Sequence, residues 1–195
     1  MNRKIAITGL SGCKHTLLAP TLSNLTGFPF IRNKTMYEWC RLCNVADPNK
    51  PKMKDLLMIA LFSFLERVVI ESYYDQFISD GISFTELILF KSHFGKQHLD
   101  KRLNKWSGIV ENLEKVSASY AAQQYDIIIH ICDESDIYAN DLYIQLLRKY
   151  NLPYKMYNND NLENVISEIA NDLGLHQIIS IENAIYHAKT DTFRR

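Results

Sequence analysis

The chain has 195 residues, of which 47% are hydrophobic and 23% are charged, and these are the usual proportions of a folded domain with a sizeable core. Its 22 Lys and Arg residues equal its 22 Asp and Glu residues, so it has no overall positive charge to hold a nucleic-acid backbone. The composition therefore argues against disorder and against a nucleic-acid partner. We expect a single domain over residues 1–195, in which residues 174–195 could form a C-terminal helical appendage and tail.

Hydrophobic runs in this sequence are short. The N-terminal segment MNRKIAITG has no long apolar region, and the longest apolar stretch, Leu56 to Leu65, is too short to span a bilayer and contains Ser63. We expect a cytoplasmic protein with no membrane segment. Cys40 and Cys43 form a single C-x-x-C pair without paired histidines, which indicates reduced thiols rather than a zinc site.

The first half of the chain alternates apolar strand patterns with helical patterns. Apolar residues recur at intervals of three and four from Leu56 to Tyr73, which predicts a long helix. Pro29 suits an edge strand, and Pro20 is placed near the first turn of its helix. The predicted elements are a strand Lys4–Thr8, a helix Thr16–Leu25, a strand Phe28–Ile31, a helix Thr35–Cys43, a loop Asn44–Lys52 and a helix Met53–Tyr74.

The second half continues the alternation. Its clearest strand, Tyr125–Ile131 (YDIIIHI), is apolar almost throughout, as a central parallel strand covered on both faces should be. The other predicted elements are a strand Gln76–Ser79 ending at Asp80-Gly81, a helix to about His93 capped by Ser83 or Thr85, a helical region Gln97–Gln124 weakened at Ser107-Gly108, a helix Tyr138–Tyr150, a strand Tyr154–Tyr157, a helix Leu162–Leu173 followed by Gly174, and a helix around Ile181–Lys189.

Strands that alternate with helices predict an α/β fold: a three-layer sandwich with a mostly parallel five-stranded sheet flanked by helices. Ligands of such sheets bind at the carboxyl ends of the strands. The segments that meet there are Gly9–Thr16, Asp80-Gly81 and Cys132–Asp136.

The segment GLSGCKHT, from Gly9 to Thr16, follows the first strand and opens the first helix, as a phosphate-binding loop does. In the motif G-x-x-x-x-G-K-[S/T], Gly9 takes the first glycine, Lys14 replaces the second glycine, His15 replaces the lysine, and Thr16 supplies the hydroxyl that binds Mg²⁺. The residues we expect to contact a nucleotide are Gly9, Ser11, Gly12, Cys13, Lys14, His15 and Thr16.

Two other interpretations of this segment stay open. A shifted alignment matches Lys14 to the motif lysine at the expense of one residue of loop length, and a plain strand-to-helix turn would explain Gly9 and Gly12 without any ligand. In the first alignment His15 is only about one-quarter protonated at neutral pH unless a phosphate raises its pKa, so binding tolerates the change better than phosphoryl transfer does.

Beyond this loop, the chain resembles the P-loop nucleoside and nucleotide kinase-like group, especially the AAA-type ATPase/kinase family that includes nicotinamide-riboside kinase domains. The resemblance runs from Lys4 to about Leu175. The segments that carry it are ITGLSGCKHTLL, ERVVIESYYDQFISDGISFTELILF, YDIIIHI and LPYKMYNNDNLENVISEIANDLGL.

The resemblance implies a P-loop fold, ATP or another nucleotide and Mg²⁺ as cofactors, and a small-molecule acceptor. It makes Asp80 a catalytic carboxylate or a metal ligand beside Thr16, with Lys14 and His15 as catalytic cations. The family's arginine after this aspartate is Gly81 here. Its lid arginine falls in CDESDIYAND, which has acidic residues (Asp133, Glu134 and Asp136) and no arginine. A basic cluster from Lys96 to Lys105 is either a solvated helix face or a lid that faces the phosphates.

We therefore expect an atypical P-loop nucleotide-binding protein, an ATP-dependent small-molecule phosphotransferase with a divergent loop. The alternative is a kinase-like binding or regulatory protein without turnover, acting with a protein partner or as a homodimer. A sulfotransferase-like enzyme, whose related loop lacks the lysine, is a third interpretation.

Overall fold

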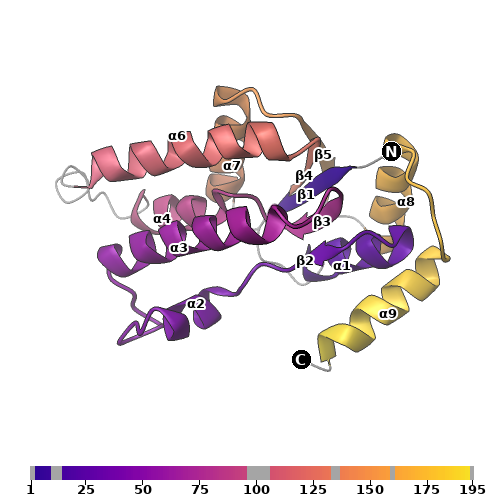
Figure 1. The fold of residues 1–195 in the computed structure, drawn as a ribbon, viewed down its shortest axis with the longest axis horizontal. Coiled ribbons are helices and arrows are strands. Elements are labelled where there is room, and N and C mark those ends of the chain that lie inside the picture. Colours follow the sequence, from indigo (N-terminus) through magenta and orange to yellow (C-terminus); the bar gives the residue numbers. More distant parts are fainter. Residues whose placement is uncertain (1–2, 10–14, 96–105, 133–136, 159–160, 194–195) are drawn as a thin grey trace.

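The computed structural model describes residues 3–9, 15–95, 106–132, 137–158 and 161–193, with the backbone alone for residues 15–16, 93–95 and 192–193 (Figure 1). Its centre is one sheet with the strand order β2-β3-β1-β4-β5, in which every neighbouring pair is parallel. The strands are β1 (Lys4–Gly9), β2 (Phe30–Ile31), β3 (Phe77–Asp80), β4 (Ile127–Cys132) and β5 (Tyr154–Asn158). The predicted five-stranded parallel sheet is confirmed.

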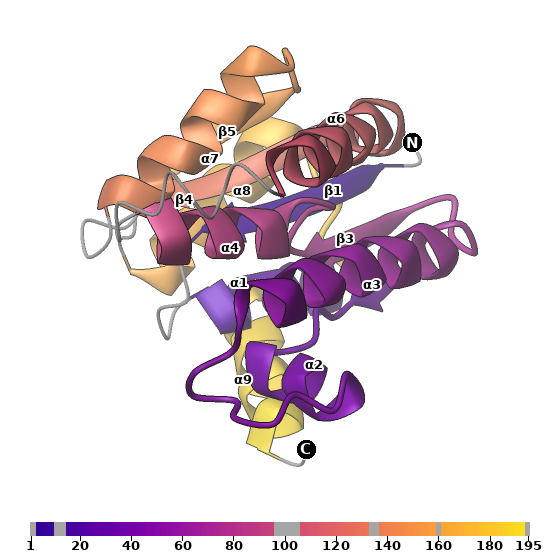
Figure 2. The same cartoon turned by 90° about the vertical axis from the view of Figure 1, so that its left-hand side faces the viewer.

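Helices cover both faces of this sheet, which completes the predicted three-layer α/β sandwich. The helices are α1 (His15–Thr26), α2 (Met36–Leu42), α3 (Met53–Glu71), α4 (Thr85–Gly95), α6 (Ser107–Gln124), α7 (Ile137–Lys149), α8 (Leu162–Leu173) and α9 (Ile181–Phe193). In β1, Ile5 and Ile7 belong to the core beneath α1, α8 and α9, whereas Ala6 belongs to the core beneath α2, α3, α4, α6 and α7. Both views show α9 running beside α1 (Figures 1 and 2).

The element boundaries follow local chemistry. Thr35 caps α2, accepting from the Glu38 backbone N–H while the Glu38 carboxylate accepts from the Thr35 N–H in return. Gly174 ends α8 in the left-handed conformation, at φ +57°. Ser107 and Gly108, which the sequence predicts to weaken a helix, are the first two residues of α6. Pro20 lies in the second turn of α1, because α1 begins at His15.

No helix within the described ranges combines the length and apolarity needed to cross a membrane.

The strand order creates a switch point at the end of β1. The crossover from β1 to β2 runs through α1 on one face, whereas the crossover from β4 to β5 runs through α7 on the other face. Connections that leave adjacent strands in opposite directions open a crevice between the carboxyl ends of those strands, where α/β sheets bind ligands. A site is therefore expected at the edge of the sheet where β1 ends.

Candidate functional site

Three neighbouring strands end at this edge of the sheet. Within the parallel pairing, Ile7 of β1 lies opposite Asp80 of β3, and Gly9 lies opposite Ile131 of β4. The helix α1 begins at His15, six residues after Gly9. β1 therefore ends beside Asp80, and of the predicted loop Gly9–Thr16 this places Gly9 near the end of β3.

Most of the predicted loop lies outside the described residues. The residues of the loop outside the described ranges include Ser11, Gly12, Cys13 and Lys14. The cluster Lys96–Lys105 and the acidic residues Asp133, Glu134 and Asp136 also lie outside those ranges. His15 and Thr16 are the first two residues of α1, described by their backbone alone. The expected phosphate contacts of this loop therefore stay predictions.

A cavity of about 260 Å³ opens beside the ends of β1 and β3. Its walls come from the end of β1, the segment after β2, the beginning of α2, the turn after β3, and one side each of α4 and α7. The residues that line it are Ile7, Thr8, Gly9, Asn33, Lys34, Thr35, Met36, Trp39, Asp80, Gly81, Thr85, Glu86, Leu89 and Tyr143. It mixes aromatic and aliphatic surface with a few polar groups, which is typical of small-molecule sites.

Asp80, like Asn33 and Thr35, also lines a second cavity of about 500 Å³, which lies against α1 and α9. Burial raises the pKa of Asp80 to about 6, and the nearby Glu86 carboxylate adds to the increase, whereas Arg67 and Arg32 oppose it. A carboxylate that titrates this close to neutrality can accept a proton during a reaction and still be mostly ionised at pH 7.

A buried arginine holds the turn that carries Asp80. Arg67 of α3 is 4% exposed and donates from Nη2 to the Asp80 carbonyl (3.0 Å) and from Nη1 to the Gly81 carbonyl (3.2 Å). Nη1 also donates to the carboxylate of Glu71 (3.1 Å) and to the Ser79 hydroxyl. The backbone at the end of β3 is thus fixed by a charged group inside the protein.

The negative partner in this network is equally enclosed. Glu71 has no exposed surface, and its carboxylate accepts hydrogen bonds from the hydroxyls of Tyr120 and Tyr125 (both 2.9 Å) and of Ser79 (3.2 Å). Because both charges have several partners, the pair avoids the penalty of an isolated buried ion.

Gly81 is the residue that lets this turn form. It has φ +88°, and a Cβ atom at this position would lie 3.0 Å from the Thr85 Oγ1 and 3.3 Å from the Arg67 Nη2. The family resemblance expects an arginine here, but the left-handed backbone and the Arg67 guanidinium account for a glycine.

We expect Gly81→Ala to destabilise the protein by about 1–3 kcal/mol, because a left-handed alanine is strained and its Cβ crowds Thr85 and Arg67. Chemical denaturation measures the change. Gly108→Ala is a matched control, since Gly108 is the second residue of α6 and has no atom within 4 Å of the added Cβ. It should leave stability unchanged or raise it by less than about 1 kcal/mol. Equal effects of the two substitutions would contradict the role given to Gly81.

A second carboxylate lies in the cavity wall. Glu86, in the first turn of α4, is 4% exposed and accepts from the Asn33 amide nitrogen at 2.7 Å. Tyr143 of α7, whose pKa is raised by burial, lines the same cavity and packs against the His130 ring at 5.3 Å between centroids. His130 Nδ1 in turn lies 2.9 Å from Thr8 Oγ1, so polar groups from β1, β4 and α7 meet beside the cavity.

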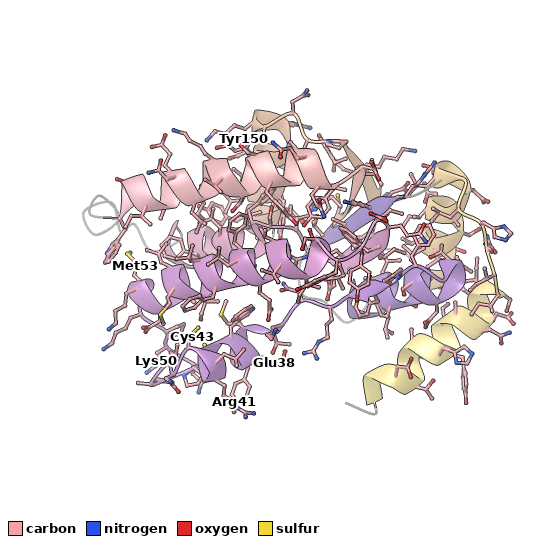
Figure 3. The ribbon with its side chains drawn as sticks, in the orientation of Figure 1. Glu38, Arg41, Cys43, Lys50, Met53 and Tyr150 are labelled. Atoms are coloured by element: carbon pink, nitrogen blue, oxygen red, sulfur yellow. The ribbon has the colours of Figure 1, made fainter. Side chains whose placement is uncertain are left out.

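Among the residues that the structure describes, the cations that line the two cavities, Lys34 and Arg32, are both paired. Lys34 forms an ion pair with Glu66 and lies 5.2 Å above the centroid of the Trp39 ring. Arg32 pairs with Glu38, which lowers the pKa of Glu38 to about 2. Figure 3 shows Glu38 and Cys43 toward opposite ends of α2. Each cation named here thus has a carboxylate partner before any ligand binds.

Sequence reasoning identified Asp80 and Gly9 but missed Arg67, Glu86, Asn33 and Trp39. Glu86 lies in the first turn of a helix, where an acidic residue is common and marks no site by itself. Trp39 and Arg67 occupy ordinary helical positions, so no local pattern distinguishes them. Their convergence depends on how α2, α3 and α4 pack beside the end of β3.

No group of three or more His, Cys, Asp or Glu side chains that could hold a metal ion occurs among the residues the structure describes. Cys40, Cys43 and Cys132 are free, and burial raises the pKa of each thiol.

Comparison with models of known protein families finds no match, and comparison with curated proteins finds none either. The geometry of the site is therefore the basis for a function.

Proposed function

We propose that the chain is a P-loop nucleotide-binding phosphotransferase, which binds ATP or another nucleotide at the segment between β1 and α1 and transfers a phosphoryl group to a small acceptor in the 260 Å³ cavity. The observation that carries the proposal is the position of Asp80. Its carboxylate ends the strand beside β1, faces the cavity, and has a pKa of about 6.

Asp80 acts on the acceptor hydroxyl. The hydroxyl oxygen attacks the terminal phosphorus of the nucleotide, the bond from that phosphorus to its bridging oxygen breaks, and the hydroxyl proton passes to the Asp80 carboxylate. The nucleoside diphosphate leaves. Because Arg67 fixes the backbone of Asp80 and Gly81, the carboxylate is positioned before the acceptor binds.

Mg²⁺ would accompany the nucleotide, with the hydroxyl of Thr16 as its expected protein ligand and Asp80 holding a metal-bound water. Mg²⁺ usually takes only one or two protein ligands beside phosphate and water. A site of that kind needs no cluster of three side chains. Bound there, Mg²⁺ would neutralise charge on the phosphate oxygens, and Lys14 and His15 would add positive charge from the loop.

The lining of the cavity supports a choice of acceptor class. Trp39, Met36 and Leu89 supply an apolar wall suited to a flat ring, and Glu86, Asn33 and Thr35 supply hydrogen-bonding groups. Asp80 and Glu86 repel an anion, while Lys34 and Arg32 already pair with carboxylates. We therefore assign an uncharged or cationic acceptor that carries hydroxyl groups, in preference to a phosphorylated one.

The paired cations also favour a second function, a kinase-like binding or regulatory protein without turnover. Phosphoryl transfer needs positive charge at the transferred group, and the described residues at the cavity offer it only through groups that already have carboxylate partners. Nucleotide binding without product formation would identify this alternative.

A thermal-shift screen tests both functions, because a ligand that binds the native state raises the melting temperature. We expect ATP or GTP with Mg²⁺ to raise it, and nucleosides or other uncharged polyols to raise it more than the corresponding monophosphates do. A monophosphate that stabilises more strongly than its nucleoside would contradict the acceptor class, and no response to any nucleotide would contradict the function.

A further inference from the structure

The outer surface of α3 is apolar where a surface helix is normally charged. After Lys54, the exposed residues of α3 are hydrophobic (Leu61, Phe62, Leu65 and Val69), and the partly exposed Glu66 beside them pairs with Lys34. These four side chains are 45–54% exposed. The charged residues Arg67 and Glu71 lie on the opposite, buried side of the same helix.

The neighbouring helix extends this apolar surface. Ile109 and Val116 of α6 are 54% and 53% exposed and stand seven residues apart, on one side of the helix. Phe64 of α3 and Tyr120 of α6 join the two helices through an edge-to-face ring contact at 5.8 Å. Figure 1 shows α3 and α6 side by side as the two long helices on this side of the molecule. We name Leu61, Phe62, Leu65, Val69, Ile109 and Val116 the α3–α6 face.

Its size and spacing match those of a helical interface. Phe62, Leu65 and Val69 repeat at three and four residues, the spacing of side chains that interlock between packed helices. A helix of 19 residues is about 28 Å long, and two adjacent helices are about 20 Å wide. Two copies would cover roughly 1,100 Å² in total, just above the ~1,000 Å² that marks a specific interface.

The charge pattern selects the partner. The six side chains of the α3–α6 face are uncharged. Glu66 of α3, one turn from Phe62 and Val69, pairs with Lys34, and Glu111 pairs with Lys115 on α6. A two-fold interface uses the same patch on both subunits. Two copies of the α3–α6 face would therefore bring no like charges together in the interface between them. We propose that this chain forms a homodimer through the α3–α6 face, with the two helices of each copy packed as a four-helix layer.

This inference does not depend on the proposed function, because none of the six side chains lines either cavity. Sedimentation velocity of the full chain tests it. We expect twice the chain mass, with dissociation on dilution. In Leu65→Glu/Val69→Glu four carboxylates would be buried in the seam of a dimer, so we expect roughly 100-fold weaker association or more.

Leu42→Glu is the matched control. Leu42 lies on α2, is 60% exposed, and is outside the α3–α6 face, so this variant should dimerise like the unmodified chain. Circular dichroism checks that each variant keeps its helices, since all three positions are at least 48% exposed. An unmodified chain that stays monomeric would overturn the proposal, because the α3–α6 face would then not bind a second copy of the chain. A dimer that survives the double substitution would overturn it too, by placing the contact elsewhere.

Discussion

Arg67→Met is expected to lower the free energy of unfolding by about 3–5 kcal/mol, the cost of leaving a buried charge without its partner. The substitution keeps an unbranched apolar stem but removes the guanidinium donors to Glu71, Ser79 and the carbonyls of Asp80 and Gly81. Glu71 would remain fully buried with its charge uncompensated. For a domain of this size the melting temperature should fall by roughly 6–20 °C.

Arg67→Met/Glu71→Gln separates the buried charge from simple loss of packing. Glutamine carries no charge and keeps one acceptor oxygen, which can serve Tyr125, while its amide nitrogen can donate to the Tyr120 hydroxyl in place of the lost carboxylate oxygen. We expect the double variant to be more stable than Arg67→Met alone, as measured by urea denaturation. If the double variant is the less stable of the two, then the interaction of Arg67 with Glu71 is not what makes the single substitution costly.

Asp80→Asn is expected to abolish phosphoryl transfer while making the protein more stable at neutral pH. The folded-state pKa of about 6 lies above the ordinary value of 3.8. Protonated Asp80 therefore favours the folded state, and this contribution is complete below pH 4 and lost as the pH rises through 6. At pH 7.5 the ionised carboxylate costs up to about 3 kcal/mol, and asparagine removes that cost.

Denaturation at two pH values measures this effect. We expect Asp80→Asn to exceed the unmodified chain in stability by about 1–3 kcal/mol at pH 7.5 and to match it near pH 4. Activity of the unmodified chain should rise with pH through about 6, since the carboxylate form accepts the proton. Lower stability of Asp80→Asn at pH 7.5 would show that the carboxylate serves the fold rather than a ligand.

The sequence predicts the fold because each level of pattern agrees. The apolar run in Tyr125–Ile131 marks a strand covered on both faces, and the structure has β4 at Ile127–Cys132 in the interior of the sheet. Pro29 indicates an edge strand, and β2 lies at the edge of the sheet. Gly174 was expected to end a helix and does so in the left-handed conformation.

The faces of α3 could not be predicted in the same way. Intervals of three and four identify the helix, but they do not say which apolar residues are buried. Leu65 and Val69 belong to the same periodic pattern as Leu56 and Ile59, yet the first two are exposed and the last two are buried. Burial of Arg67 in place of an apolar residue depends on the carbonyls that end β3, which only the folded chain brings to it.

Only part of the candidate site could be predicted from the sequence, again because helix packing decides the rest. The position of Asp80 follows from a strand that ends beside the first strand of a parallel sheet. Glu86, Asn33 and Trp39 come from three further segments, and their convergence is a property of helix packing. No local motif marks such residues, since each is unremarkable in its own element.

Isothermal titration of the protein with ATP and Mg²⁺ tests the central claim most directly. We expect saturable heat for the unmodified chain, retained binding in Asp80→Asn without Mg²⁺, and loss of binding in Gly12→Val, because a branched side chain would obstruct the backbone N–H groups of the predicted loop. Thr16→Ala should weaken the contribution of Mg²⁺. No heat with ATP or any other nucleotide, with or without Mg²⁺, would contradict a nucleotide site between β1 and α1.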